Sequence, residues 1–141
     1  MKSVVFDTNV LLDLFVFNDF RALHLKQLLV EKQIDALASP KTLEEFTDVI
    51  SRELFSLEPA AQEKILLEWR SLARIVEDQC LLPSPWHCLD PDDQVFLDLA
   101  FTVKPCILIS KDNEVLKLAA KASQEDVLIT ANYHIMDSHH D

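Results

Sequence analysis

The sequence contains no glycine, and this absence excludes several classes of protein. Dinucleotide-binding fingerprints, P-loops and the phosphate loops of kinases all need glycine where the backbone approaches a phosphate. Positive charge is also scarce, because 13 Lys and Arg residues stand against 24 Asp and Glu residues and give a formal net charge of −11. The charge therefore argues against a protein that binds nucleic acid through a generally basic surface. It does not argue against a nuclease, since carboxylates that hold metal ions are counted among the acidic residues.

Cysteines and long apolar runs are sparse as well. The three cysteines form no CxxC pair, so we expect neither a disulfide framework nor a cysteine zinc site, and a reducing cytosol is the natural compartment. The first apolar run stops at Asp7, which argues against a signal peptide. The run over residues 10–17 is interrupted by Asp13 and is too short to span a bilayer. We therefore expect a cytoplasmic protein that does not use a membrane.

Length and composition predict one globular domain. The chain has 141 residues, of which 49% are hydrophobic, and both values are ordinary for a single domain with its own core. We expect residues 1–141 to form this domain, with a frayed tail from about 137 to 141. His139, His140 and Asp141 are residue types that bind transition metals, but a frayed tail is the favoured interpretation of this segment.

Short apolar runs alternate with helical patterns along the chain. The expected strands are 3–6, 34–38, 74–77, 106–110 and 127–130, and the expected helices are 9–17, 19–31, 41–53, 59–71, 91–102 and 113–121. Apolar runs without alternation suit strands that are buried on both faces of a parallel sheet. The order of elements predicts an α/β fold of three layers, α/β/α, with a central five-stranded parallel sheet. Its central strands should be the first and the fourth, which are the most apolar.

Two acids follow predicted strands directly. Asp7 comes after the first strand and Asp112 comes two residues after the apolar part of the fourth. In open α/β sheets, ligands bind at the carboxyl ends of the strands. A helix N-cap is the alternative role for each aspartate.

Asp93 lies at the start of a predicted helix. Asp90 is expected to cap this helix, with Pro91 in its first position. The apolar stripe of the helix falls three, four and seven residues after Asp93, so its side chain should face inward, whereas Asp98 should face solvent. An inward carboxylate needs a partner or a metal ion.

Two neighbouring glutamates lie on another predicted helix, whose apolar stripe includes Phe46 and Val49. At about 100° per residue, Glu45 flanks this stripe while Glu44 points away from it. Glu45 is therefore the better candidate for an inward site, and a solvated flank is the alternative. Four converging carboxylates would repel one another unless they surround hard cations such as Mg²⁺ or Mn²⁺. Such a site can hydrolyse phosphodiester bonds.

The stretches around these four acids, in their order along the chain, resemble the motifs of PIN-domain ribonucleases. The matching stretches are Asp7-Thr8-Asn9-Val10-Leu11, Thr42-Leu43-Glu44-Glu45-Phe46, Asp90-Pro91-Asp92-Asp93 with Phe96, Leu97 and Ala100, and Ile107-Leu108-Ile109-Ser110-Lys111-Asp112. The resemblance implies that Asp7, Glu45, Asp93 and Asp112 are the catalytic and metal-binding acids, with Mg²⁺ or Mn²⁺ as cofactor. It also implies an accessory acid, an orienting amide and a supporting hydroxyl, which fall on Glu114, Asn9 and Ser110.

Many proteins of this family are the toxins of bacterial toxin–antitoxin pairs. The resemblance therefore implies an RNA substrate, a small antitoxin protein as partner, and a homodimer. Leu25, Leu28 and Leu29 offer a dimer interface, or alternatively belong to the core of the monomer. The alternative function is a PIN-like module that binds protein or RNA through a weak or inactive site.

Contacts to RNA would rely on local positive charges. The four candidates are Lys41, Arg52, Lys111 and Lys117, and a solvated surface charge is the alternative role for each. Lys111 stands where many members of the family have glycine before the fourth acid. Its ammonium group would contact a substrate phosphate or compete in part with the metal ion.

Overall fold

The computed structural model describes residues 1–140, and the side chains of residues 1–137. Five parallel strands form one sheet in the order β3-β2-β1-β4-β5. The strands are β1 (Lys2–Phe6), β2 (Ile34–Ala38), β3 (Arg74–Ile75), β4 (Cys106–Ile109) and β5 (Val127–Thr130). The helices are α1 (Thr8–Phe15), α2 (Leu23–Val30), α3 (Pro40–Ile50), α4 (Pro59–Leu72), α5 (Pro91–Thr102), α6 (Asn113–Leu116) and α7 (Ala119–Ser123), with 3₁₀ turns η1 (Phe20–Ala22), η2 (Glu53–Phe55), η3 (Asp78–Cys80) and η4 (Ile135–His140).

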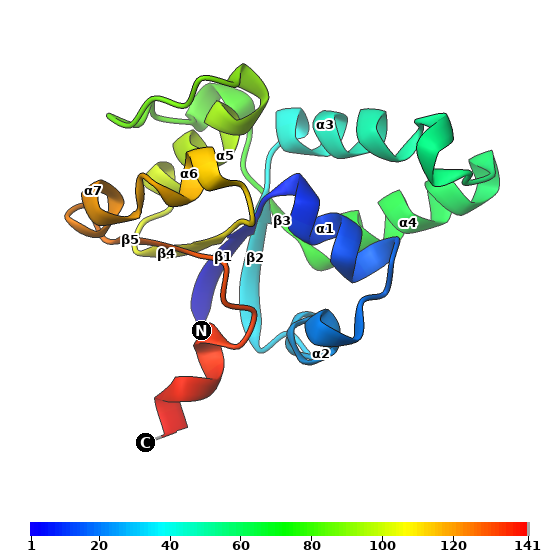
Figure 1. Ribbon diagram of the computed structural model, residues 1–141, viewed down its shortest axis with the longest axis horizontal. Helices are drawn as coiled ribbons and strands as arrows, with labels where there is room; N and C mark the ends of the chain where they lie inside the picture. The colour runs from blue at the N-terminus through cyan, green and yellow to red at the C-terminus, as the bar shows by residue number, and fades with distance from the viewer. Residues whose placement is uncertain (141) are drawn as a thin grey trace.

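The helices form a layer on each face of the sheet (Figure 1). Val4 and Phe6 of β1 pack into a core shared with α1 to α4, whereas Val5, between them, packs into a second core with α5. This alternation follows from the pleat, which points successive side chains to opposite faces. The predicted three-layer α/β fold with a five-stranded parallel sheet is confirmed, and β1 and β4 are interior strands as expected.

The register of β1 and β4 brings their carboxyl ends together. Phe6 pairs with Ile109, and the amide of Asp7 donates a hydrogen bond of 3.0 Å to the carbonyl of Ile109. From these ends α1 packs on one face of the sheet and α6 on the other. The two strands therefore end side by side at a switch point, where open α/β sheets bind ligands.

Several elements are shorter than the sequence predicts, among them the following three. The helix expected over 19–31 begins as η1, because the side chain of Asp19 caps the amide of Arg21 and the Ala22 amide bonds to the Asp19 carbonyl. The helix expected over 113–121 is divided into α6 and α7 at Leu118, whose amide bonds three residues back to Val115. The strand expected over 74–77 is β3, which covers two residues.

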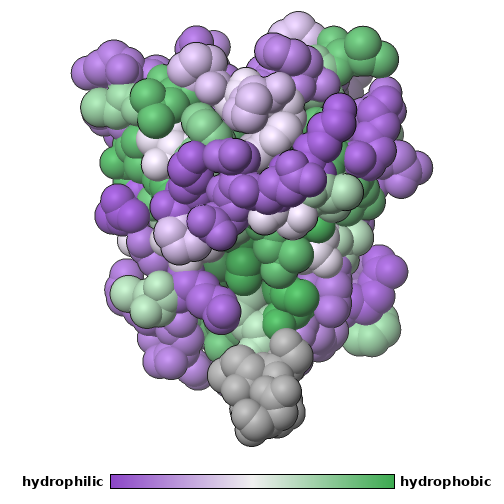
Figure 2. Space-filling model, turned by 90° about the vertical axis from the view of Figure 1, so that its left-hand side faces the viewer, coloured by the Kyte–Doolittle hydropathy of each residue, from purple (hydrophilic) through white to green (hydrophobic). Residues whose placement is uncertain are grey.

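The leucines proposed as a dimer interface lie in the core. Leu25 is 0% and Leu29 1% exposed, and the half-buried Leu28 packs against the same cluster. The core interpretation is therefore correct for these residues, because α2 uses them to cover the sheet. Apolar surface does lie elsewhere: Figure 2 shows an apolar patch below a hydrophilic band on the face beside β5, where Leu128 is 44% exposed.

The chain reaches left-handed backbone conformations without glycine. Positive φ angles occur at Asn18 (46°), Lys32 (57°), Ser56 (51°) and Asp126 (62°). Lys32 ends α2, where its amide bonds to the carbonyl of Leu29 and the next amide bonds to that of Leu28. This is the Schellman pattern, which normally places glycine at the left-handed position.

The last described element, η4, comes after Tyr133 and lies below the sheet in the view of Figure 1. Met136 belongs to the first core. The tail predicted from about 137 falls largely on residues whose side chains lie outside the description, including His139, His140 and Asp141, and it stays a prediction. Within residues 1–140, no helix is long and apolar enough to cross a membrane.

Candidate functional site

Asp7 is a buried carboxylate at the end of β1. Its Oδ2 accepts a hydrogen bond of 2.6 Å from the hydroxyl of Ser110, which follows β4. Asp7 occupies the N-cap position of α1, as the alternative supposed, but in the described structure its side chain makes no capping hydrogen bond to that helix. Burial raises the pKa of Asp7, while the Ser110 hydrogen bond and the amides of Thr8 and Asn9 oppose this shift. The residue is thus a desolvated acid with one strong side-chain donor.

Asp112 reaches the same place from β4. Its amide donates a 3.0 Å hydrogen bond to Oγ of Ser110, so this one hydroxyl connects Asp7 with Asp112. The Asp112 side chain also caps α6 by accepting from the amide of Glu114 at 2.8 Å. Both roles considered from the sequence therefore apply to this residue: it is an N-cap, and it lies beside another acid.

Asp93 joins these two acids from α5. Asp90 caps this helix through the amide of Asp92, and Pro91 takes the first helical position, as expected. Burial raises the pKa of Asp93 to about 7, with further contributions from the charge of Asp7 and from a hydrogen bond to the carboxyl group of Asp112. Asp93 therefore holds its proton up to about neutral pH, next to Asp7 and Asp112.

Glu45 lies farther out, on α3. It is half-buried and Glu44 is exposed, which agrees with the facing inferred from the helical pattern. Burial raises the pKa of Glu45, and the neighbouring negative charges that add to the shift belong to Asp92, Asp48 and Asp90. Glu45 lines a cleft of ≈ 500 Å³ between α3 and α5. The fold thus groups Asp7, Asp93 and Asp112 and places Glu45 in the adjacent cleft.

The donor set of this cluster suits a hard cation, although the carboxyl groups are not arranged around one. Among the described residues, no group of three or more His, Cys, Asp or Glu side chains is placed to hold a metal ion. Asp7, Asp93 and Asp112 nevertheless offer oxygen ligands, which Mg²⁺ and Mn²⁺ prefer. The hydroxyl of Thr8, next to Asp7, is buried without a hydrogen-bond partner in the described structure.

Three of the four residues that are candidates for contacting RNA form ion pairs with acidic side chains. Lys111 contacts Asp13 at 2.7 Å, Lys117 contacts Glu114 at 2.7 Å, and Arg52 contacts Asp48 at 3.0 Å. Glu114, the expected accessory acid, is thereby engaged at the surface. Lys41 lines the acidic cleft with Glu45, and Asn9 is exposed at the start of α1.

Sequence reasoning gave Asp13 no role. Its side chain is 4% exposed and accepts hydrogen bonds from Nζ of Lys111 at 2.7 Å and from the hydroxyl of Tyr133 at 2.6 Å. The sequence does contain a signal for such a role. Asp13 lies inside the apolar run 10–17, and a carboxylate that is buried with this run needs hydrogen-bonding or charged partners.

Asp98 does not point to solvent as expected. It is half-buried and accepts hydrogen bonds from the amide of Ser84 at 2.9 Å and from the side-chain amide of Gln94 at 3.0 Å. The prediction was wrong because the loop before α5, which contains Trp86, folds over this side of the helix. Trp86 itself is buried and packs edge-on against Phe101.

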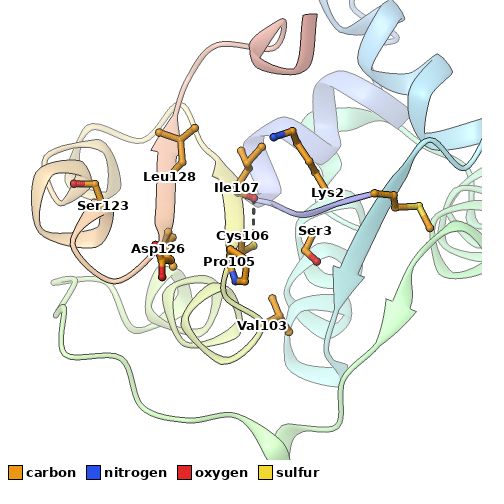
Figure 3. Close-up of a pocket in the computed structure, with 11 residues that line it drawn as sticks. Lys2, Ser3, Val103, Pro105, Cys106, Ile107, Ser123, Asp126 and Leu128 are labelled. Carbon is orange, nitrogen blue, oxygen red and sulfur yellow. Dashed lines mark hydrogen bonds between the residues drawn. The ribbon is translucent and has the colours of Figure 1, made fainter. Parts of the chain in front are cut away.

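A second cleft, of ≈ 520 Å³, lies at the opposite edge of the sheet, at the amino ends of β1, β4 and β5 (Figure 3). Lys2, Ile107 and Leu128 line it together with Asp126. None of the four acids expected to form the metal site lines this cleft, so it is separate from the carboxylate site.

Comparison with known proteins places this chain in a family. Neither the curated proteins nor the solved structures yield a match. The family model described as PIN domain matches residues 3–134, which is almost the whole chain, and PIN domains are generally nucleases. The match agrees with the five-stranded parallel sheet and its covering helices. The chain belongs to the PIN-domain family.

Proposed function

We propose that this protein is a metal-dependent ribonuclease whose site is built on Asp7, Asp93 and Asp112, with Glu45 at its edge. The observation that carries the proposal is the convergence of three acids: Asp7 and Asp112 contact the same Ser110 hydroxyl, and Asp93 lies beside both. These acids come from three separate elements and would repel one another strongly if all were ionised without a cation. A structural role alone does not account for that arrangement, because each acid adds to the cost of burying the others.

The residues that would hold Mg²⁺ or Mn²⁺ are Asp7, Asp93 and Asp112. When bound, the ion would activate water, position the scissile phosphate and stabilise the departing oxygen. Ser110 orients Asp7 and, through the Asp112 amide, Asp112 as well. The pKa of Asp93 is raised to about 7, so this carboxyl group gives up its proton close to neutral pH. Asn9 would contact the phosphate or a bound water from the start of α1.

Glu45 and Lys41 are proposed to act from the cleft between α3 and α5. Both line this cleft, which lies beside the helix that carries Asp93. Glu45, with its raised pKa, would act through a water molecule, and Lys41 would contact a phosphate of the RNA. Arg52, Lys111 and Lys117 are weaker candidates for RNA contacts, because each is already paired with an acid.

The preference for RNA, the role as the toxin of a toxin–antitoxin pair, the small antitoxin partner and the homodimer are proposals that come from the family resemblance. One observation favours the alternative of a binding module: among the side chains described, those of residues 1–137, no three ligands are already placed around an ion position. The two functions differ in whether the acids are needed, and metal binding separates them.

The test is a calorimetric Mn²⁺ titration of the protein beside Asp7→Asn, followed by cleavage assays on unstructured RNA and on single-stranded DNA. We expect the substitution to abolish Mn²⁺ binding and cleavage while thermal unfolding remains cooperative. Asp126→Asn is the matched control, because Asp126 is exposed near the amino end of β5 and asparagine tolerates its positive φ. Cleavage retained by Asp7→Asn would sink the proposal. A folded protein that binds no Mn²⁺, even with RNA present, would favour the binding module.

A further inference from the structure

The Asp13 carboxylate joins three segments that are far apart in sequence. Asp13 lies on α1, Lys111 follows β4, and Tyr133 follows β5, and both of these side chains donate to the same oxygen, Oδ2. The carboxylate is 4% exposed, whereas the lysine side chain is 41% exposed and reaches inward to it. We propose that Asp13 is a positioning residue that, through Lys111, holds the turn from Ser110 to Asp112 in the geometry the carboxylate site requires. This inference rests on the proposed function.

The placement of Lys111 in the chain carries the argument. It stands between Ser110, which donates to Asp7, and Asp112, whose amide donates to the same Ser110 hydroxyl. Lys111 contacts Asp13 on α1, whereas its two neighbours contact each other and Asp7. The turn therefore belongs to the carboxylate site through Ser110 and Asp112 and is held to α1 through Lys111.

The pair of Asp13 and Lys111 is a strong restraint that holds the turn to α1. Removing the cationic partner of a buried carboxylate is strongly destabilising, so Asp13 favours the conformation in which Lys111 reaches it. Both hydrogen bonds are short, as expected for donors on an ionised oxygen. Small displacements of catalytic groups reduce turnover steeply, and this pair restrains the residue next to Asp112. Lys111 thus has a defined role other than contacting RNA or competing with the metal ion.

Tyr133 offers a matched control within the same cluster. Its hydroxyl bonds to the same oxygen of Asp13, but Tyr133 lies beyond β5 and not in the turn of the site. Removing this hydroxyl disturbs the buried carboxylate and leaves the link from Asp13 through Lys111 to the turn in place. A role in stability alone predicts the same effect for both partners of Asp13, whereas a positioning role predicts different effects.

The experiment compares the protein with Lys111→Met, Lys111→Arg, Asp13→Asn and Tyr133→Phe. Mn²⁺ affinity is measured by calorimetry, and the hydrogen exchange of the Asp112 amide, which donates to Ser110, is measured by NMR without metal. We expect Lys111→Met and Asp13→Asn to weaken Mn²⁺ binding by about tenfold or more, as losses of supporting contacts at metal sites do, and to speed exchange of the Asp112 amide. Lys111→Arg should retain both properties. Tyr133→Phe should lose stability but retain both.

The inference is overturned if Lys111→Met keeps the affinity for Mn²⁺ and the slow exchange of the Asp112 amide. It is also overturned if Tyr133→Phe loses them to the same extent as Lys111→Met, since that would indicate a structural role only. Should Asp13→Asn fail to fold, the lysine and tyrosine variants still decide the question. A wild-type protein that binds no Mn²⁺ even with RNA present contradicts the proposed function, while amide exchange measured without metal still tests the positioning of the turn.

Discussion

The hydroxyl of Ser110 donates a 2.6 Å hydrogen bond to Oδ2 of Asp7, a residue 103 positions earlier in the chain. The parallel register of β1 and β4 creates this contact, because Phe6 pairs with Ile109 and the residues that follow them lie side by side. The same oxygen of Ser110 accepts the amide of Asp112 at 3.0 Å. One buried hydroxyl therefore sets the geometry of two acids.

Substitution of Ser110 tests this geometry. Ser110→Ala should lower the free energy of unfolding by about 1–3 kcal/mol, because Asp7 would remain buried without its side-chain donor. It should also raise the pKa of Asp7 further and reduce metal-dependent cleavage. Urea unfolding at pH 7 and RNA cleavage per folded molecule measure the two effects. Ser39→Ala, which removes the N-cap of α3, is the control: it should cost about 1 kcal/mol and leave cleavage nearly unchanged.

The paired glutamates on α3 test the edge of the site. Glu45→Gln should reduce metal-dependent cleavage about 10–100-fold, the range seen when a residue supporting a metal site is removed. Glu44→Gln removes the same charge one residue away, from a more exposed position that also lines the cleft, and should keep cleavage within about twofold. Initial rates at saturating Mn²⁺ provide the comparison. Equal effects of the two substitutions would assign the loss to surface charge rather than to Glu45.

The raised pKa of Asp93 predicts an unusual dependence of stability on pH. Because the folded protein holds a proton up to about pH 7 that the unfolded chain releases near pH 4, stability should fall as pH rises from about 4 to about 7. Above the folded pKa this contribution is lost. Asp93→Asn should flatten the slope and raise the melting temperature at pH 8. Thermal unfolding in metal-free buffer from pH 4 to pH 8 measures both; a wild-type stability that increases through this range would contradict the prediction.

Lys32 tests how a chain without glycine ends a helix. Lys32→Gly should stabilise the protein by about 1 kcal/mol, because glycine adopts the positive φ of 57° without the steric cost that a Cβ atom imposes. Lys32→Ala removes the same charge and keeps the Cβ atom, so it should give little of this gain. Denaturant unfolding compares the two variants. If both are equally stable, the left-handed conformation at this position carries no appreciable cost.

The order of elements and the facing of several side chains could be read from the amino-acid pattern. Unbroken apolar runs predicted buried parallel strands, and the first and fourth lie inside the sheet. Asp7 and Asp112 were placed at one edge because both follow strands, and Asp90 with Pro91 marked the start of α5. These inferences succeed because the periods of helices and strands are local properties that few neighbouring residues determine.

Only the folded chain decided which distant side chains meet. Lys111 pairs with Asp13 across 98 positions, and Tyr133 reaches the same carboxylate across 120. Glu45 faces inward as its helical pattern indicates, yet it lies in a cleft beside the other acids rather than among them. Periodicity states which side of an element a residue occupies, but the partner it finds there depends on strand register and helix packing. Those are set by the whole core at once, and no local stretch of sequence contains them.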